Sequence, residues 1–330
     1  MLDIGKLPSE LLERLVFDNI GFKREEVLIR PGIGEDCAVV DFGSYDCVLT
    51  ADPITAAVKD IGSLSVHISC NDVAAKGVEP LGIMLVILMP KGSTEEDIKE
   101  IMAQAGNAAQ ELNVEIIGGH TEVTTAVTKP VIVSTALGRA LKGKVQNPAQ
   151  MEEGDLLYIT KYAGLEGTGI IAKDREKELS DILNKEELAE AKSLLDLVSV
   201  VREGVILGKL GTHGMHDVTE GGILGAIWEM CQIAGKGALI KADAIPVKEV
   251  TKKICDIFDI DYLRLISSGS MMVVLSPDVK EEAETAMKEA SIIFTKIGTV
   301  TEKGMGIKLD VDGKIKEVEP PGADEIYKAV

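Results

Sequence analysis

The stretch His213-Gly-Met-His-Asp-Val-Thr-Glu-Gly-Gly222 holds the strongest of several motifs from which we predict the fold of this chain. A strand is expected to end at His216 and Asp217, and a helix from 222 to 234 is expected to follow, with Thr219 as its cap. Capping accounts for Thr219, but not for an aspartate, two histidines and two glycines together. Because Gly221 and Gly222 have no side chain, the backbone N–H groups here are accessible to a ligand. We therefore predict a functional turn at this position.

Acidic residues upstream of this turn stand where the fold alone does not require them. Asp36 ends Gly32-Ile-Gly-Glu-Asp36, Asp52 ends a strand, and Asn71-Asp72 lies inside a helix of small and apolar residues. Taken singly, each is compatible with ordinary turn chemistry. Asp72 is harder to explain in this way, because a buried carboxylate is costly unless it is paired or bound to metal. Three carboxylates from separate segments would suit Mg²⁺.

Two glycine-rich segments are weaker signals. In Ile116-Ile-Gly-Gly-His-Thr-Glu122 a strand is expected to end in a turn at Gly118-Gly119. Three roles stay open for His120: a ligand, an acid–base group or a turn residue. The loop with Gly164 and Gly167 follows a strand and precedes a helix, a context that favours an anion at the helix N-terminus. Its G-x-x-G-x-G spacing matches neither the dinucleotide fingerprint nor the Walker pattern.

Length, charge and periodicity restrict the class of protein. With 330 residues we expect two domains, 1–145 and 150–330, separated by a polar stretch that contains Pro148. The net charge of -19 argues against a nucleic-acid partner. Five dispersed cysteines indicate a reducing compartment. We see no signal peptide, and the apolar run 81–89 is about half of the roughly 20 residues of a membrane span, so we expect a cytoplasmic protein without membrane contact.

Apolar periodicity predicts a mixed α/β (α+β) architecture. In the first half, strands are expected at 37–41, 46–51, 81–89, 114–117 and 131–137, with helices at 9–19, 60–76 and 93–112. In the second half, a strand at 155–160 precedes the Gly164 loop, 182–210 is mostly helical, and further strands near 238, 271, 294 and 307 alternate with helices. Each half would therefore contain its own sheet.

The order of these motifs resembles the superfamily of aminoimidazole ribonucleotide (AIR) synthase, thiamine-monophosphate kinase, selenophosphate synthetase and the hydrogenase maturation carbamoyl dehydratase. The resemblance implies a two-domain fold in which the N-terminal mixed sheet pairs with its twin into a β-barrel-like dimer core, beside a C-terminal α/β domain. It also implies ATP and Mg²⁺ as cofactors. The residues it implies are Asp36, Asp52 and Asp72 for metal, Asn71, Gly118, Gly119, Thr121, Gly164, Gly167, Thr219, Gly221 and Gly222 for ATP or phosphate, and Asp217 and His120 for catalysis.

Among the branches, the chain is most similar to the hydrogenase maturation type. That enzyme carries its substrate on a C-terminal cysteine, whereas the last cysteine here is Cys255, and His120 stands where the family commonly has an acidic residue. We therefore expect a maturation-factor-like homodimer that uses Mg-ATP to activate a carbonyl or amide oxygen or a phosphate acceptor. Its partner would be a small-molecule acceptor or a maturation protein. Two alternatives stay open, a non-catalytic dimeric partner in a maturation complex and a small-molecule kinase of the thiamine-monophosphate kinase type.

Overall fold

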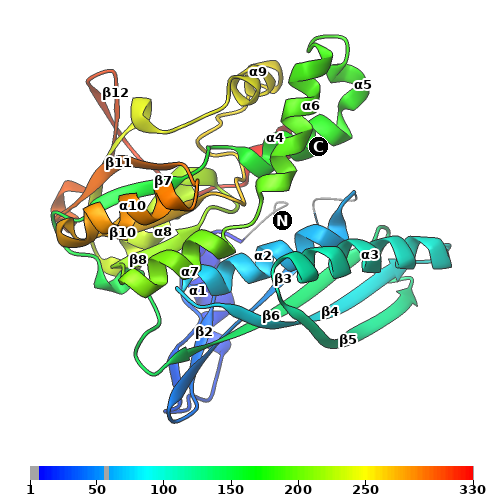
Figure 1. Cartoon of the computed structure of the whole chain (residues 1–330), viewed down its shortest axis with the longest axis horizontal. Coiled ribbons are helices and arrows are strands. Elements are labelled where there is room, and N and C mark those ends of the chain that lie inside the picture. Colours follow the sequence, from blue (N-terminus) through cyan, green and yellow to red (C-terminus); the bar gives the residue numbers. More distant parts are fainter. Residues whose placement is uncertain (1–6, 56–58, 330) are drawn as a thin grey trace.

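The computed structural model describes residues 7–55 and 59–329 and contains two β-sheets, one in each half of the chain (Figure 1). The first sheet has the strand order β1-β2-β3-β6-β4-β5, and all its neighbours are antiparallel except β4 and β5. Its strands are β1 (Val27–Ile29), β2 (Ala38–Asp41), β3 (Tyr45–Ile54), β4 (Pro80–Pro90), β5 (Glu115–Thr124) and β6 (Val131–Leu141).

Helices α2 (Ile61–Ala75) and α3 (Glu95–Glu111) cover one face of this sheet, and a short helix α1 (Ser9–Leu15) precedes it (Figure 1). Helix α3 begins with a capping box between Thr94 and Asp97, and it turns its apolar stripe to the core. Helix α2 is buried almost all round, because it also packs against the second half of the chain. This position explains why its sequence is made of small and apolar residues.

The second sheet has the order β13-β12-β9-β11-β7-β10-β8, and among its neighbouring pairs only β9 and β12 run parallel. Its strands are β7 (Leu156–Thr160), β8 (Gly214–Asp217), β9 (Gly237–Lys241), β10 (Met271–Leu275), β11 (Phe294–Thr301), β12 (Ile307–Val311) and β13 (Lys314–Glu317). Strands β7, β8 and β10 are buried along their whole length, and β7 and β10 therefore appear in the sequence as short apolar runs, whereas β8 contains His216 and Asp217.

Helices lie on both sides of the second sheet. Helix α8 (Gly222–Ala234) packs on one face, and α7 (Val201–Leu210) and α10 (Lys280–Glu289) pack on the other. Helices α4 (Leu165–Asp174), α5 (Glu176–Leu179), α6 (Lys185–Ser193) and α9 (Glu249–Phe258) form a separate apolar cluster at the upper right of Figure 1. None of the helices in the described part of the chain is long and apolar enough to cross a membrane.

The expected mixed α/β class with one sheet in each half is confirmed, and two local predictions are wrong. Strand β5 does not end before Gly118 but continues to Thr124 alongside β4. Thr219 does not cap α8. The N-cap is Gly221, and the Thr219 carbonyl accepts a hydrogen bond from Gly222 N–H at 3.1 Å. The domain limits 1–145 and 150–330 stay a prediction.

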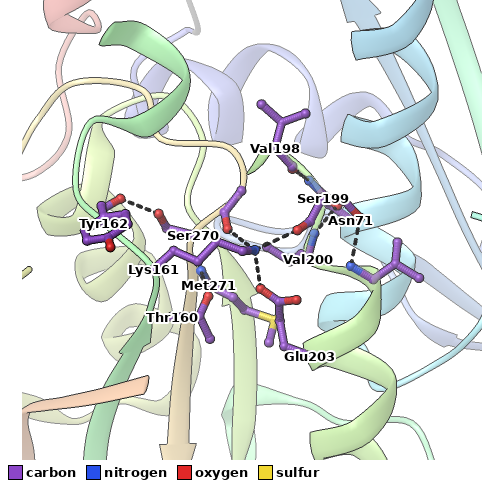
Figure 2. A network of polar contacts seen from close by, with 12 residues as sticks. Asn71, Thr160, Lys161, Tyr162, Val198, Ser199, Val200, Glu203, Ser270 and Met271 are labelled. Atoms are coloured by element: carbon purple, nitrogen blue, oxygen red, sulfur yellow. Dashed lines mark hydrogen bonds and ion pairs between the residues drawn. The ribbon is translucent and has the colours of Figure 1, made fainter. Parts of the chain in front are cut away.

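A polar network joins the two halves of the chain (Figure 2). The Asn71 amide on α2 donates to Val198 O at 2.7 Å and accepts from Val200 N–H at 2.8 Å. The loop 198–200 also contacts the Lys161 ammonium. Lys161 donates a hydrogen bond to Ser199 O and forms an ion pair with the buried Glu203. Since buried ion pairs and amides are costly to leave unmatched, this network fixes α2 against the second half.

Candidate functional site

Three aspartates from separate segments of the first half meet at one threonine. The Thr50 hydroxyl on β3 lies 2.7 Å from Asp72 Oδ2, 3.0 Å from Asp52 Oδ2 and 2.9 Å from Asp36 O. Asp52 lies two residues along the same strand and therefore on the same side of it. Asp36, Asp52 and Asp72 therefore lie close together, Asp36 through its backbone carbonyl at this contact, and their role as metal ligands stays a prediction.

Strand β8 of the second half brings Asp217 and His216 to the same place. One ligand atom from each of Asp36, His216 and Asp217 can be chosen so that all lie within 4.8 Å of one another. The His216 Nδ1 lies 2.6 Å from the Asp217 carbonyl oxygen, and its Nε2 lies 3.5 Å from Asp36 Oδ2 and 3.3 Å from Glu229 Oε2. The acidic cluster, defined as Asp36, Asp52, Asp72 and Asp217, therefore combines both halves of the chain.

The electrostatics of the acidic cluster are unfavourable without a cation. Burial raises the pKa of Asp72 well above its ordinary value, and the charges of Asp217, Asp52 and Asp36 raise it further. Burial, followed by the charge of Asp36, raises the pKa of Asp217 to about 7. Among the described residues neither side-chain oxygen of Asp217 has a hydrogen-bond partner. Because oxygen donors crowded in this way are what hard divalent cations bind, the residues present fit a Mg²⁺ ion.

Without a bound cation, His216 supplies positive charge beside these carboxylates. Burial alone would lower the pKa of His216, but the charge of Asp36 and the contact with Glu229 outweigh it and raise the pKa to about 9. In the described part of the chain, none of the four aspartates forms a salt bridge with a lysine or arginine. The cluster therefore keeps an excess of negative charge.

A pocket of about 560 Å³ opens above the cluster, between the two halves of the chain. Asp36 and Asp52 line it, whereas Asp72 and Asp217 are buried at 4% and 0% exposure. Both halves contribute to its walls, which include residues 7–9, 11, 12 and 17, the loop 31–35, Glu220, Glu229 and the segment 321–323. A pocket of this size accommodates a small-molecule ligand.

Other residues that the sequence implicated do not reach the pocket. Gly118, Gly119, His120 and Thr121 lie in β5, at the far edge of the sheet, where His120 is exposed and pairs with Glu122 at 3.3 Å. Strand β5 is three strand spacings from β3, or about 14 Å. Within one chain they are therefore separated from the acidic cluster, and their binding and catalytic roles stay a prediction.

The remaining residues that were predicted to contact phosphate have structural roles of their own. The Asn71 amide is fully buried and holds the loop 198–200. A Cβ on Gly167 would come within 2.5 Å of Leu265, and one on Gly222 within 2.6 Å of Leu263 O, so close packing requires glycine at both positions. Gly164 adopts a left-handed φ of +64°, as glycine readily does.

The N-terminus of α8 is already occupied by a carboxylate of the chain itself. Asp324 Oδ2 accepts a hydrogen bond from Gly221 N–H at 2.7 Å, and its other oxygen accepts from Ile266 and Ile326. Thr219 is half-buried in the connection before Gly221. A phosphate role for Thr219, Gly221 and Gly222 is therefore still a prediction.

Three site residues escaped the sequence-based assignment. His216 stands next to Asp217, but a histidine alone does not indicate a ligand; the signal was its place at the end of a short buried strand. Thr50 precedes Asp52 by two residues, which is the strand period. Glu229 lies on α8, two turns from the motif, and sequence offers no sign that it faces His216.

Comparison with known proteins agrees with this architecture. Residues 34–140 match the model of the AIR synthase related protein N-terminal domain, and residues 152–310 match that of the C-terminal domain. The chain belongs to the AIR synthase related family. The two matched ranges lie in the same order as the two sheets, and Asp36 and Asp217 fall one in each range.

Curated proteins that are similar to this chain include hydrogenase maturation proteins. A putative hydrogenase expression/formation protein of Methanocaldococcus jannaschii is 28% identical over 98% of this chain and 96% of its own length. A carbamoyl dehydratase HypE of Bradyrhizobium diazoefficiens is 28% identical over 86% of this chain and 80% of its own length.

Solved structures share the fold at low sequence identity. HypE in a HypE–HypF complex has a TM-score of 0.78 at 24% identity, covering 94% of this chain and 99% of its own. HypE in complex with ATP has a TM-score of 0.74 at 21% identity, covering 96% and 95%. ThiL complexed with AMPPCP and TMP has a TM-score of 0.76 at 19% identity, covering 98% and 99%.

Proposed function

We propose that this chain is a Mg-ATP-dependent enzyme whose acidic cluster holds the cation that binds the nucleotide phosphates. The observation that carries the proposal is the meeting of Asp36, Asp52, Asp72 and Asp217 at a pocket between the two halves. A bound Mg²⁺ would neutralise these carboxylates and polarise the phosphate that is transferred. The family relationship and the solved structures of HypE with ATP and ThiL with AMPPCP support it.

In this proposal the residues divide into three tasks. Asp36 and Asp52, which line the pocket, face the cation and the phosphates. Asp72 and Asp217 complete the set of oxygen ligands from the buried side of the site. Thr50 keeps Asp52 and Asp72 at fixed positions. The network of Asn71 and Lys161 keeps both halves in register, so that β8 presents Asp217 to the first half.

The acceptor is not a cysteine of this sequence. Cys37, Cys70, Cys231 and Cys255 are buried, and burial raises the pKa of the last three to about 12 and that of Cys37 well above its ordinary value. Burial also raises the pKa of the half-buried Cys47. Since only a thiolate is a good nucleophile, we infer that the activated group is passed to a small molecule or to a partner protein.

The names of the curated relatives favour a role in hydrogenase maturation. The alternative role for the chain is that of a non-catalytic partner protein in a maturation complex. The alternative predicts a stable complex without ATP hydrolysis. Steady hydrolysis that depends on Asp217 would exclude it.

We further propose that the chain acts as a homodimer that pairs through β4 and β5. Strand β5 is an edge strand, and Leu81, Met84, Ile117 and Val123 of these two strands are 40–57% exposed. An open edge beside exposed apolar side chains is a typical protein interface. Pairing here would cover the region that contains Gly118 and His120.

Calorimetric titration of ATP, with and without Mg²⁺, tests the enzyme proposal. We expect binding only with Mg²⁺, and at least tenfold weaker binding for Asp52→Asn, which removes a charge but keeps the shape of the side chain. Asp243→Asn, at an exposed position outside the pocket, is the matched control and should bind as the wild type does. No binding of ATP by the wild type in the presence of Mg²⁺ would refute the proposal.

A further inference from the structure

His216 has the features of a metal-ligating histidine. Its side chain is only 2% exposed, and its Nδ1 lies 2.6 Å from the Asp217 carbonyl oxygen. Nδ1 must donate its proton in this contact, because a carbonyl oxygen can only accept. Metal-bound histidines almost always donate their second ring nitrogen in this way, which leaves the other nitrogen as the donor atom to the metal.

The opposite nitrogen of His216 points into the acidic cluster without a hydrogen bond. Nε2 lies 3.3 Å from Glu229 Oε2 and 3.5 Å from Asp36 Oδ2, but within the described residues it has no partner in hydrogen-bond geometry. The same is true of both carboxylate oxygens of Asp217, which is completely buried. Three buried atoms of two neighbouring residues therefore have no hydrogen-bond partner among the described residues, although buried polar atoms are normally satisfied.

The distance between His216 Nε2 and Asp36 Oδ2 fits two ligands of one ion, and Asp217 lies near enough to reach that ion with a small shift. Two ligand atoms that are each about 2.1 Å from a metal, at a tetrahedral angle, lie about 3.4 Å apart. The distance between His216 Nε2 and Asp36 Oδ2 is 3.5 Å, and the set completed by Asp217 spans no more than 4.8 Å.

We propose that Asp36, His216 and Asp217 form a mixed nitrogen–oxygen site for a divalent first-row transition-metal ion, with His216 Nε2 as a direct ligand. The inference rests on the proposed cation site and specifies its chemistry. Mg²⁺ prefers oxygen donors and keeps its water, whereas imidazole suits Fe²⁺, Ni²⁺ and Zn²⁺. A histidine ligand thus shifts the preference of the site away from Mg²⁺ alone.

The competing interpretation is that His216 is only a counter-ion for Asp36 and Glu229. A permanent buried charge pair is expected to form short, aligned hydrogen bonds, because alignment offsets part of the desolvation cost. The Nε2 contacts of 3.3 and 3.5 Å lack that alignment. The geometry therefore favours a ligand position.

Pulsed electron paramagnetic resonance of bound Mn²⁺ tests the inference directly. Electron spin-echo modulation from ¹⁴N should appear when Mn²⁺ is added to the wild-type chain, and it should be lost in His216→Gln. His213→Gln is the matched control, because His213 lies three residues earlier and pairs with Asp155 instead. We also expect His216→Gln to weaken Mn²⁺ binding at least tenfold and Mg²⁺ binding less than threefold.

The outcomes separate this inference from the proposed function. Bound Mn²⁺ without ¹⁴N modulation, or no bound Mn²⁺, overturns the histidine ligand even if Mg-ATP binds normally. Modulation without any nucleotide binding overturns the proposed enzyme but keeps the metal site. Should His216→Gln fail to fold, the modulation must persist in His213→Gln and His120→Gln; its loss in either would assign the ligand elsewhere and refute the proposal.

Discussion

At the scale of single residues, Glu166 provides a measurable pH dependence outside the metal site. It is 2% exposed on α4, and its Oε2 has no hydrogen-bond partner in the described part of the chain. Burial raises its pKa from 4.5 to about 7. The folded protein therefore retains this proton between pH 4.5 and 7, and the stability linked to it is complete below pH 4.5 and lost as the pH rises through 7.

We expect Glu166→Gln to be more stable than the wild type at pH 8, but not at pH 5. The difference in free energy of unfolding between the two proteins should change by about 2 to 3 kcal/mol over this interval. Urea unfolding at both pH values measures it. Glu289→Gln, at an exposed position, serves as the control and should show no such change. If the difference in free energy of unfolding between Glu166→Gln and the wild type were the same at both pH values, the Glu166 carboxyl would already be ionised at pH 5.

Thr50 provides a second prediction at this scale. Thr50→Val keeps the shape of the side chain but removes the hydroxyl that contacts Asp52 and Asp72. The variant should lose about 1 to 3 kcal/mol of stability, because the buried Asp72 loses a hydrogen-bond partner. It should also bind Mg²⁺ more weakly, since the two carboxylates are no longer held together. Unfolding and calorimetric titration measure the two effects, and unchanged Mg²⁺ affinity would show that Thr50 does not position them.

At the scale of elements, β5 shows why a glycine pair was misread as a turn. The sequence cannot show that Gly119 lies against β4, where a Cβ would come within 1.9 Å of Leu85 O, at a φ of +146°. Gly118, in contrast, would meet only Met84, at 3.9 Å. The requirement for glycine here comes from the approach of two strands, which is a tertiary contact.

The two neighbouring glycines allow a matched test of this explanation. Gly119→Ala should reduce the free energy of unfolding by about 3 kcal/mol or more, because β5 must move away from β4 or adopt strained dihedral angles. Gly118→Ala should change it by less than about 1 kcal/mol. Denaturant unfolding of both variants measures the difference. Equal effects would indicate that the backbone of β5 is not constrained as the structure shows.

Most elements were predictable because their patterns are local. The capping box of α3 and the apolar runs of β4 and β7 are visible in the sequence itself. The aspartates of the acidic cluster were predictable because carboxylates stood where local structure did not need them. The contacts of Glu229 and Asp324 were not predictable. Their partners, His216 and Gly221, lie about 13 and 100 positions away in the sequence.

At the scale of the whole molecule, the two halves act as one unit at the acidic cluster. Asp36, Asp52 and Asp72 come from the first half and Asp217 from the second, and Asn71, which joins α2 to the loop 198–200, lies on the same helix that carries Asp72. The cation site therefore exists only when the halves are docked. Binding of a cation should accordingly stabilise the docked state by an amount that grows with the logarithm of the ratio between the free cation concentration and its Kd.

The homodimer is the remaining whole-molecule prediction, and it can be tested without a ligand. Val123 on β5 is 57% exposed, and a charge there would have to be buried in the proposed interface. We expect the wild type to sediment as a dimer and Val123→Glu to sediment as a monomer at micromolar concentration. Ile315→Glu is the control, because Ile315 is 56% exposed on β13, the edge strand of the other sheet. Dissociation by Ile315→Glu but not by Val123→Glu would place the interface on the second sheet, and a monomeric wild type would rule out the dimer.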